Sequence, residues 1–269
     1  MTVIPARRAG VKRIILATPP RKHGAVDPHI LAVASLLDVD EVYKMGGAQA
    51  IAAMAFGTKT IPKVDKIVGP GNAYVAEAKR QVFGFVDVDT IAGPSEIAVI
   101  ANRSSNAQYV LADLLGETEH TGGIGFLITT SKALARLAKK QVPGGYCIVV
   151  KNLDEAADAA NRLAPEHLEI MVRSPQKVAK RITRAGAIFL GPYSPVTVGD
   201  YVAGPSHVLP TGGAARAFSG LGIDDFIRRT HVISYTKKAL ERMREPLEQL
   251  TAIEGLPRHY DAVKIRLSG

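Results

Sequence analysis

Cysteine is almost absent from this sequence, and long apolar runs are absent altogether. The single cysteine, Cys147, cannot form a disulfide within the chain and excludes a metal site built from four cysteines. A chain without disulfides is typical of a reducing cytoplasm. The sequence has no apolar run of membrane-spanning length, and its first residues, MTVIPARRAGVKR, lack the apolar core and cleavage site of a signal peptide. We therefore expect a cytoplasmic protein with no membrane partner.

Basic residues outnumber acidic residues, but they form no continuous run. The formal net charge is +9, which is compatible with nucleic-acid binding. The basic residues lie in dispersed pairs such as Arg7-Arg8 and Lys139-Lys140, with neither an aromatic-rich RNA motif nor zinc-finger spacing. We therefore expect no nucleic-acid partner, because an anionic cofactor or a basic surface explains the charge as well.

Short runs of β-branched residues alternate with segments of helical periodicity. With 269 residues, 46% of them hydrophobic, the chain can build one large domain or two ordinary ones. The alternation predicts an α/β fold with parallel sheets covered by helices. Two successive sheets are favoured, with a break near residues 92–95. We predict strands at 12–17, 41–43, 66–68, 96–101, 126–129, 147–150, 170–172 and 187–190, and helices at 28–37, 46–56, 73–83, 109–120, 132–141, 153–164, 175–185 and 236–252.

The predicted helix that ends near residue 120 carries a Glu-x-x-His spacing. Residues three apart on a helix share one face, so Glu117 and His120 could bind one divalent ion such as Zn²⁺. The alternative is a solvated helix end, at which a cationic histidine lies near the negative end of the helix dipole. Other parts of the chain must supply the remaining ligands.

Two short turns bring glycines to the start of a helix, at Gly46-Gly47 and at residues 69–72 (GPGN). Such turns allow a pyrophosphate to approach backbone N–H groups at a helix N-terminus. Neither turn fits the G-x-G-x-x-G dinucleotide fingerprint, and an ordinary connection between strand and helix explains them equally well.

Three further stretches carry residues suited to catalysis or metal binding. Glu166 and His167 follow a predicted helix at an edge of the sheet where sites often form, and they could divide general-acid and general-base roles; the alternative is a surface turn. Residues 191–222 are a long loop rich in glycine, proline and serine, which in a compact domain is usually functional. Asp200 in this loop could be a metal ligand or a turn residue. The stretch 254–259 (EGLPRH) ends the last predicted helix and could be a fraying terminus.

Taken together, these stretches resemble the histidinol dehydrogenase family along nearly the whole chain. The similarity lies in VKRIILATPP, GGAQAIAAMAFGT, KIVGPGNAYVAEAKRQV, IAGPSEI, LAPEHLE, GDYVAGPSHVLPTGG and EGLPRH, and several motifs in this order are far more specific than any one of them. The resemblance implies an NAD- and zinc-dependent enzyme that oxidises L-histidinol through histidinaldehyde to L-histidine. It also implies a homodimer that shares its active sites.

Particular roles also follow from the resemblance. It implies one zinc ion per subunit, the acid–base pair Glu166 and His167, and NAD contacts from Gln49 and Asn72. The implied metal ligands are Glu117, His120, Asp200 and, from the other subunit, His259. These four residues and His167, with Ser95, His207 and Glu254, would surround the substrate. The implied domains are an incomplete Rossmann-like NAD-binding domain (1–94), a second α/β domain with the metal and acid–base residues (95–217), and a helical tail that contacts the partner subunit (218–269).

The sequence departs from the family pattern in two main ways, and in a minor way at residues 121–125, which look shortened and richer in glycine than the family's loop. Glu117 stands where the family normally has glutamine, and Met1 aligns inside the family pattern, so we expect an N-terminally truncated chain. These departures leave two alternatives open: a paralogue that oxidises another amino or secondary alcohol, and a truncated homologue without catalytic activity.

Overall fold

The computed structural model describes residues 1–39, 41–91 and 93–268 and divides into two compact units. The first unit covers Met1–Ile227 and the second covers Arg228–Gly269. All paired strands of the described chain run parallel, which confirms the predicted α/β fold with parallel sheets. Within the described ranges, none of the helices is long and apolar enough to cross a membrane.

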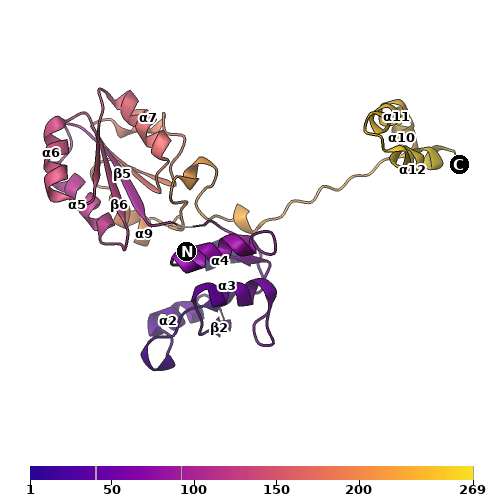
Figure 1. Ribbon diagram of the computed structural model, residues 1–269, viewed down its shortest axis with the longest axis horizontal. Helices are drawn as coiled ribbons and strands as arrows, with labels where there is room; N and C mark the ends of the chain where they lie inside the picture. The colour runs from indigo at the N-terminus through magenta and orange to yellow at the C-terminus, as the bar shows by residue number, and fades with distance from the viewer. Residues whose placement is uncertain (40, 92, 269) are drawn as a thin grey trace. The chain divides into compact units, whose positions relative to one another are not determined.

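The main sheet of the first unit has five strands in the order β7-β6-β5-β8-β9. Its strands are β5 (Glu96–Ala101), β6 (Ile124–Thr129), β7 (Tyr146–Val149), β8 (His167–Met171) and β9 (Ala187–Leu190). Strands β5 and β8 are buried along their whole length, because helices cover both faces of a parallel sheet. One face is covered by α5 (Ala107–Thr118), α6 (Lys132–Gln141) and α9 (Val196–Tyr201), and the other by α7 (Leu153–Leu163) and α8 (Pro175–Ala179). Figure 1 shows β5 and β6 between α5 and α6 on one side and α7 on the other.

The alternation of side chains along β8 decides what faces the site. Leu168 and Ile170 pack in the core beneath α7 and α8, whereas Met171 packs in the core beneath α5 and α9. Successive residues of a strand point to opposite faces. His167 and Glu169 therefore lie on the face that α5 and α9 cover.

The chain before the main sheet forms two small parallel sheets. One pairs β1 (Ile15–Ala17) with β2 (Glu41–Tyr43), and the other pairs β3 (Lys66–Ile67) with β4 (Asp87–Val88). Four helices accompany them, namely α1 (Val3–Arg8), α2 (Pro28–Leu36), α3 (Gly47–Phe56) and α4 (Ala73–Val82). Helix α3 packs on α4, and their apolar side chains form a small core with β3 and β4.

The second unit consists of three short helices, α10 (Lys237–Arg242), α11 (Arg244–Ile253) and α12 (Pro257–Leu267). The hydroxyl of Tyr260 donates to Glu248 across α11 and α12 at 2.9 Å. The single helix predicted for 236–252 is broken at Met243, because the ring of Pro246 would clash with the carbonyl of Arg242 in a continuous helix. A helical C-terminal segment is confirmed.

Several local predictions were wrong or incomplete. Cys147 was expected in a buried strand, but β7 lies at the sheet edge and Cys147 is only half-buried. The predicted helix 175–185 ends at Ala179, and the supposedly irregular segment 191–222 contains α9. The sequence signal also missed α1, β4 and α12. The predicted break at residues 92–95 includes Ala92, which lies outside the described residues.

Candidate functional site

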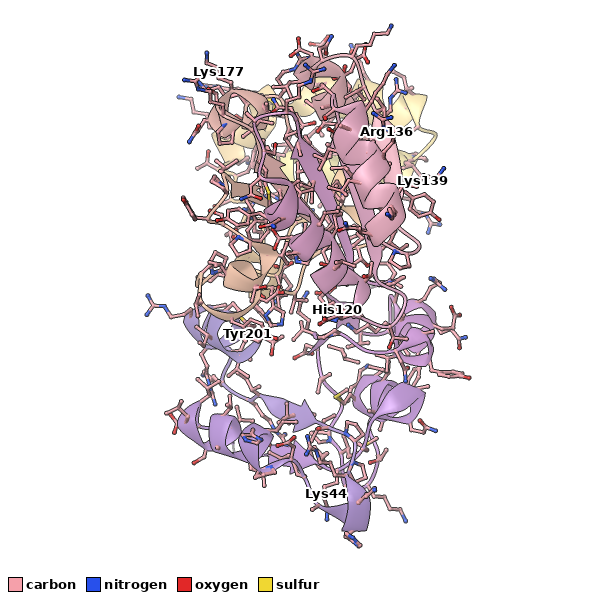
Figure 2. The ribbon with its side chains drawn as sticks, turned by 90° about the vertical axis from the view of Figure 1, so that its left-hand side faces the viewer. Lys44, His120, Arg136, Lys139, Lys177 and Tyr201 are labelled. Atoms are coloured by element: carbon pink, nitrogen blue, oxygen red, sulfur yellow. The ribbon has the colours of Figure 1, made fainter. Side chains whose placement is uncertain are left out.

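The candidate site lies at the amino edge of the main sheet. His167 is the first residue of β8, Ser95 directly precedes β5, and Glu117 lies in the last turn of α5, which returns to this edge. In Figure 2, His120 and Tyr201 lie at one end of the sheet, whereas Lys177, which follows β8, lies toward the other. Ligands of open α/β sheets usually bind at the carboxyl ends of strands. The Glu166-His167 stretch instead joins a helix to a strand, so the site forms at the opposite edge.

A change in backbone direction places Glu166 and His167 at this edge. Helix α7 ends at Leu163, and its C-cap, Ala164, adopts the left-handed conformation with φ 51°. That conformation commonly ends a helix, and Pro165 cannot continue it. The chain therefore turns into β8 three residues earlier than the sequence predicted, and β8 buries His167 and Glu169.

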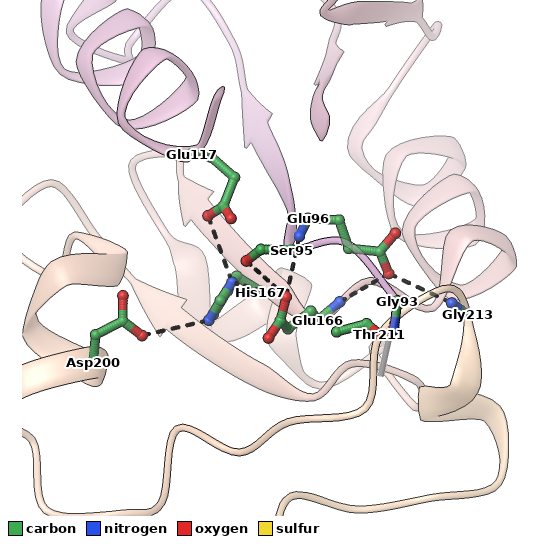
Figure 3. Close-up of polar contacts among 9 residues, drawn as sticks. All are labelled: Gly93, Ser95, Glu96, Glu117, Glu166, His167, Asp200, Thr211 and Gly213. Carbon is green, nitrogen blue, oxygen red and sulfur yellow. Dashed lines mark hydrogen bonds and ion pairs between the residues drawn. The ribbon is translucent and has the colours of Figure 1, made fainter. Parts of the chain in front are cut away.

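His167 lies between two carboxylates that come from different helices (Figure 3). Its Nδ1 is 3.6 Å from Oε2 of Glu117 on α5, and its Nε2 is 3.7 Å from Oδ1 of Asp200 on α9. Burial lowers the pKa of His167, although both carboxylates oppose that shift. The imidazole is thus held neutral beside two acceptors, which suits a group that must accept a proton.

Glu166 lies next to His167 and is held by hydroxyl and backbone donors. Its Oε2 accepts from the hydroxyl of Ser95 at 2.9 Å and from the backbone N–H of Glu96 at 3.1 Å. Burial, despite these hydrogen bonds, raises its pKa to about 7. A carboxyl group that titrates near neutral pH can both accept and return a proton under ordinary conditions.

The donor set at this edge fits a divalent cation. One ligand atom each from Glu117, Glu166 and His167 lies within 4.8 Å of the others, and all three residues are buried. Among the described residues, Oε1 of Glu117 and Nδ1 of His167 are buried without a hydrogen-bond partner. Buried polar atoms are nearly always paired, so a bound ion is a natural partner for the Glu117 carboxylate.

The other predicted metal- and substrate-binding residues lie outside this buried cluster. His120 is exposed and follows the end of α5, so it does not share a helical face with Glu117 as expected. His259 lies in α12 and Glu254 at the end of α11, both exposed residues of the second unit. The EGLPRH stretch is thus not a fraying terminus, because α12 begins within it. Exposed His207 contacts the carbonyl oxygen of Asp200 through Nδ1 at 3.0 Å.

A cavity of ≈ 360 Å³ opens beside His167. Its lining combines polar groups of His167, Asp200 and His207 with apolar surface from Phe189 and Leu209. The Phe189 ring lies 6.0 Å from the His167 ring, centroid to centroid. An apolar chamber with a few convergent polar groups is typical of a small-molecule site.

The glycine turn at 69–72 is occupied by contacts within the chain. The N–H of Gly69 donates to Oδ2 of Asp89 at 2.7 Å, and Oδ1 of Asn72 accepts from the N–H of Val75 as an N-cap. These two N–H groups are therefore engaged already. Asn72 and Gln49 are both exposed near helix N-termini, where an anionic cofactor is favoured.

Sequence reasoning missed three acids of this region. Glu96 and Glu169 are buried on strands β5 and β8, and Asp113 is half-buried on α5. For Glu96 and Glu169 the sequence did carry a signal, because a charged residue inside an otherwise apolar strand must be paired or protonated.

Comparisons with known proteins agree with one another. A family model described as histidinol dehydrogenase matches residues 1–267. Histidinol dehydrogenase from Bacillus cereus is 50% identical over 285 aligned residues, which cover 99% of this chain and 66% of that protein. The enzyme from Listeria monocytogenes is 48% identical with the same coverage.

A crystal structure of histidinol dehydrogenase from Elizabethkingia anophelis superposes with a TM-score of 0.92 at 39% identity, covering 100% of this chain and 66% of that one. The chain thus spans about two thirds of the length of the relatives it matches.

Proposed function

The chain belongs to the histidinol dehydrogenase family, and from this premise we propose that it oxidises L-histidinol through histidinaldehyde to L-histidine with zinc and NAD. One observation carries the proposal. A buried, neutral imidazole lies between the carboxylates of Glu117 and Asp200, beside a carboxyl group whose pKa is about 7. This arrangement provides the two proton acceptors that two successive oxidations need.

His167 acts in the oxidation of the alcohol. Its lowered pKa keeps the ring neutral, so it can accept the hydroxyl proton, and NAD bound at the site would take the hydride. The flanking carboxylates of Glu117 and Asp200 then stabilise the imidazolium that results. In the second step the aldehyde must take up water, and Glu166 accepts a proton from the attacking water molecule. Ser95 holds Glu166 in place through their hydrogen bond.

Glu117 and Asp200 are the proposed metal ligands of the first unit, and His120 and the partner subunit's His259 complete the proposed set. A zinc ion held by these residues would supply positive charge that orients the imidazole and amino nitrogens of the substrate. His207, which lines the same cavity, and Glu254 also bind the substrate in this proposal. Gln49 and Asn72 contact NAD.

The domain organisation follows the same proposal. Residues 1–94 form part of a Rossmann-like NAD-binding domain, residues 95–217 form the domain with the metal and acid–base residues, and residues 218–269 reach the partner subunit of a homodimer. The separate small core that α3 and α4 form with β3 and β4 supports a distinct N-terminal domain, and the helical second unit, which begins at Arg228, supports a C-terminal tail.

A paralogue with another alcohol substrate is the alternative that one observation favours. Glu117 is buried and stands where the family resemblance implies glutamine. The extra negative charge strengthens the attraction for a cation but makes the bound ion a poorer Lewis acid. A substrate that needs less polarisation would tolerate this change. A homologue that binds metal but transfers no hydride is the third possibility.

These three hypotheses are tested by following NADH absorbance after purified protein is mixed with NAD and L-histidinol. Metal content is measured on the same sample. Two NADH per histidinol consumed, dependent on bound zinc, is the expected result. Turnover of another amino alcohol without turnover of histidinol would favour the paralogue. Bound zinc without any NADH would identify the non-catalytic homologue.

A further inference from the structure

A second row of polar groups lies directly behind the candidate site. The three elements that carry Glu117, His167 and Asp200 each carry a second member of this row. On α5 it is the carboxyl of Asp113, four residues before Glu117. On α9 it is the backbone N–H of Val196, four residues before Asp200. Residues four apart lie on the same helical face.

On β8 the second member is Glu169, which lies two residues after His167 and hence on the same face of the sheet. Glu169 is 1% exposed, and its Oε1 accepts from the backbone N–H of Val196 at 2.9 Å. Asp113 approaches it from α5, and burial together with that neighbouring carboxylate raises the pKa of Glu169 to about 9. Glu169 is therefore a neutral acid that joins β8 to α9.

The contact matters because α9 is short and its start is otherwise held by the packing of Val196 in the core. The helix is six residues long, and its N-cap, Pro195, makes no side-chain capping hydrogen bond. Helices this short are marginal without tertiary contacts. The carboxyl of Glu169 takes the place of the missing N-cap side chain, so it fixes the helix that presents Asp200.

We propose that Glu169 is a positioning residue which, by accepting the first N–H of α9, holds Asp200 opposite Glu117 and so sets the spacing of the two carboxylates around His167. The inference rests on the proposed function in one respect, since the spacing matters for a bound cation. The geometric claim, that Glu169 holds α9, concerns the metal-free chain as well.

Two neutral substitutions at Glu169 differ in whether they keep the hydrogen-bond acceptor. Glu169→Gln keeps an acceptor for Val196, whereas Glu169→Leu has similar volume and no acceptor. The first readout is hydrogen exchange of the α9 amides in metal-free protein, followed by mass spectrometry. We expect faster exchange for the leucine variant and near wild-type exchange for the glutamine variant. The second readout is the zinc dissociation constant, measured by chelator competition where circular dichroism shows every variant folded. A loss on the order of 10-fold is expected for leucine only.

A backbone test removes the donor and leaves Glu169 intact. Val196→Pro deletes the N–H that Glu169 accepts and also replaces the buried valine side chain, and proline is favoured at the first position of a helix. Val196→Ala is the matched control, because it loses the side chain but keeps the N–H. The proline variant should reproduce the effect of Glu169→Leu in both readouts, and the alanine variant should not.

The outcomes separate the inference from the proposed function. Wild-type exchange in both Glu169→Leu and Val196→Pro would overturn the inference. Equal losses in the glutamine and leucine variants would also overturn it, because the acceptor would then be irrelevant. If the wild-type chain binds no zinc, the proposed metal site fails, and hydrogen exchange alone decides whether Glu169 holds α9.

Discussion

Glu96 and Glu166 exchange hydrogen bonds across the amino ends of β5 and β8. The backbone N–H of Glu96 donates to Oε2 of Glu166 at 3.1 Å, and the backbone N–H of Glu166 donates to Oε1 of Glu96 at 3.3 Å. The same oxygen of Glu96 accepts from the N–H of Gly213 at 3.4 Å. Each carboxyl therefore fixes the backbone of the other, and the loop that ends at Gly213 is tied to the same point (Figure 3).

Replacing Glu166 with glutamine should flatten the pH dependence of stability in metal-free protein. Burial raises the folded-state pKa of Glu166 from 4.5 to about 7. Its contribution is fully favourable below pH 4.5 and is lost as pH rises through 7, because only the unfolded chain is ionised between these values. The free energy of unfolding of Glu166→Gln, relative to that of wild type, should therefore rise by up to about 3 kcal/mol from pH 4.5 to pH 8. Urea unfolding measures this difference, and parallel curves for the two proteins would contradict the assigned pKa.

Replacing His167 with asparagine should abolish most of the rate of NADH formation and leave zinc content unchanged. The substitution removes the proposed proton acceptor but none of the proposed zinc ligands. A loss of about 10²–10⁴-fold is typical for a general base. The check is NADH formation with L-histidinol together with metal analysis of the same sample. If the variant lost zinc in proportion to activity, His167 would be a ligand and its assignment as base would be wrong.

Hydrophobic periodicity was sufficient to predict the bounds of several helices and strands. The bounds of β2, β5, α6 and β9 agree with the predicted ranges, because each is framed by turn or capping residues and has a clear apolar pattern. Ser131, for example, caps α6 by accepting from Leu134. Helix α9 was not predictable in this way, since it is short, lacks an N-cap side chain and depends on Glu169.

The candidate site was less predictable than the fold, because its contacts are long-range. Glu117 and His167 are fifty residues apart in the printed sequence, and only the return of α5 to the amino edge of the sheet brings them together. The Glu-x-x-His spacing drew attention to His120, yet α5 ends at Thr118. The buried partner of Glu117 is His167, for which no local spacing rule exists.

Breaking the ion pair between Lys79 and Asp89 should strongly destabilise the N-terminal part of the chain. The Nζ of Lys79 is 2.6 Å from Oδ1 of Asp89, and each side chain is 3% exposed. Lys79→Met leaves the carboxylate buried and unpaired, which costs about 3–5 kcal/mol of unfolding free energy. The double variant Lys79→Met/Asp89→Asn removes that charge but keeps an acceptor for Gly69, so it should recover most of the loss. A double variant as unstable as the single one in urea unfolding would show that the unpaired charge is not the cause.

Ligand sharing between subunits predicts complementation. His259→Ala and Asp200→Ala should each bind zinc weakly and be inactive alone. If the proposed dimer exchanges subunits, a mixed dimer regains one complete site, with Asp200 from one chain and His259 from the other. About a quarter of the wild-type activity should return on mixing equal amounts after reversible dissociation. Absence of any recovery, with mixed dimers verified by native mass spectrometry, would remove the support for shared sites.

Restoring glutamine at position 117 should separate stability from metal binding. Glu117 is 4% exposed, and its Oε1 has no hydrogen-bond partner among the described residues. Burying such a charge destabilises the metal-free chain, so Glu117→Gln should raise its melting temperature in the presence of a chelator. The same change removes negative charge from the cation site, which should weaken zinc binding on the order of 10-fold.

The rise in melting temperature on adding zinc reports metal binding, because the stabilisation by a ligand grows with the logarithm of its affinity for the folded state. The rise should be smaller for Glu117→Gln than for wild type, although the variant starts from a higher value. Glu119→Gln is the matched control, since Glu119 is exposed two residues away and has the same charge. An equal zinc-induced rise in all three proteins would show that Glu117 does not face the ion. A smaller rise confined to Glu117→Gln would identify its carboxylate as the feature that sets this chain's metal affinity apart from that of a glutamine-bearing site.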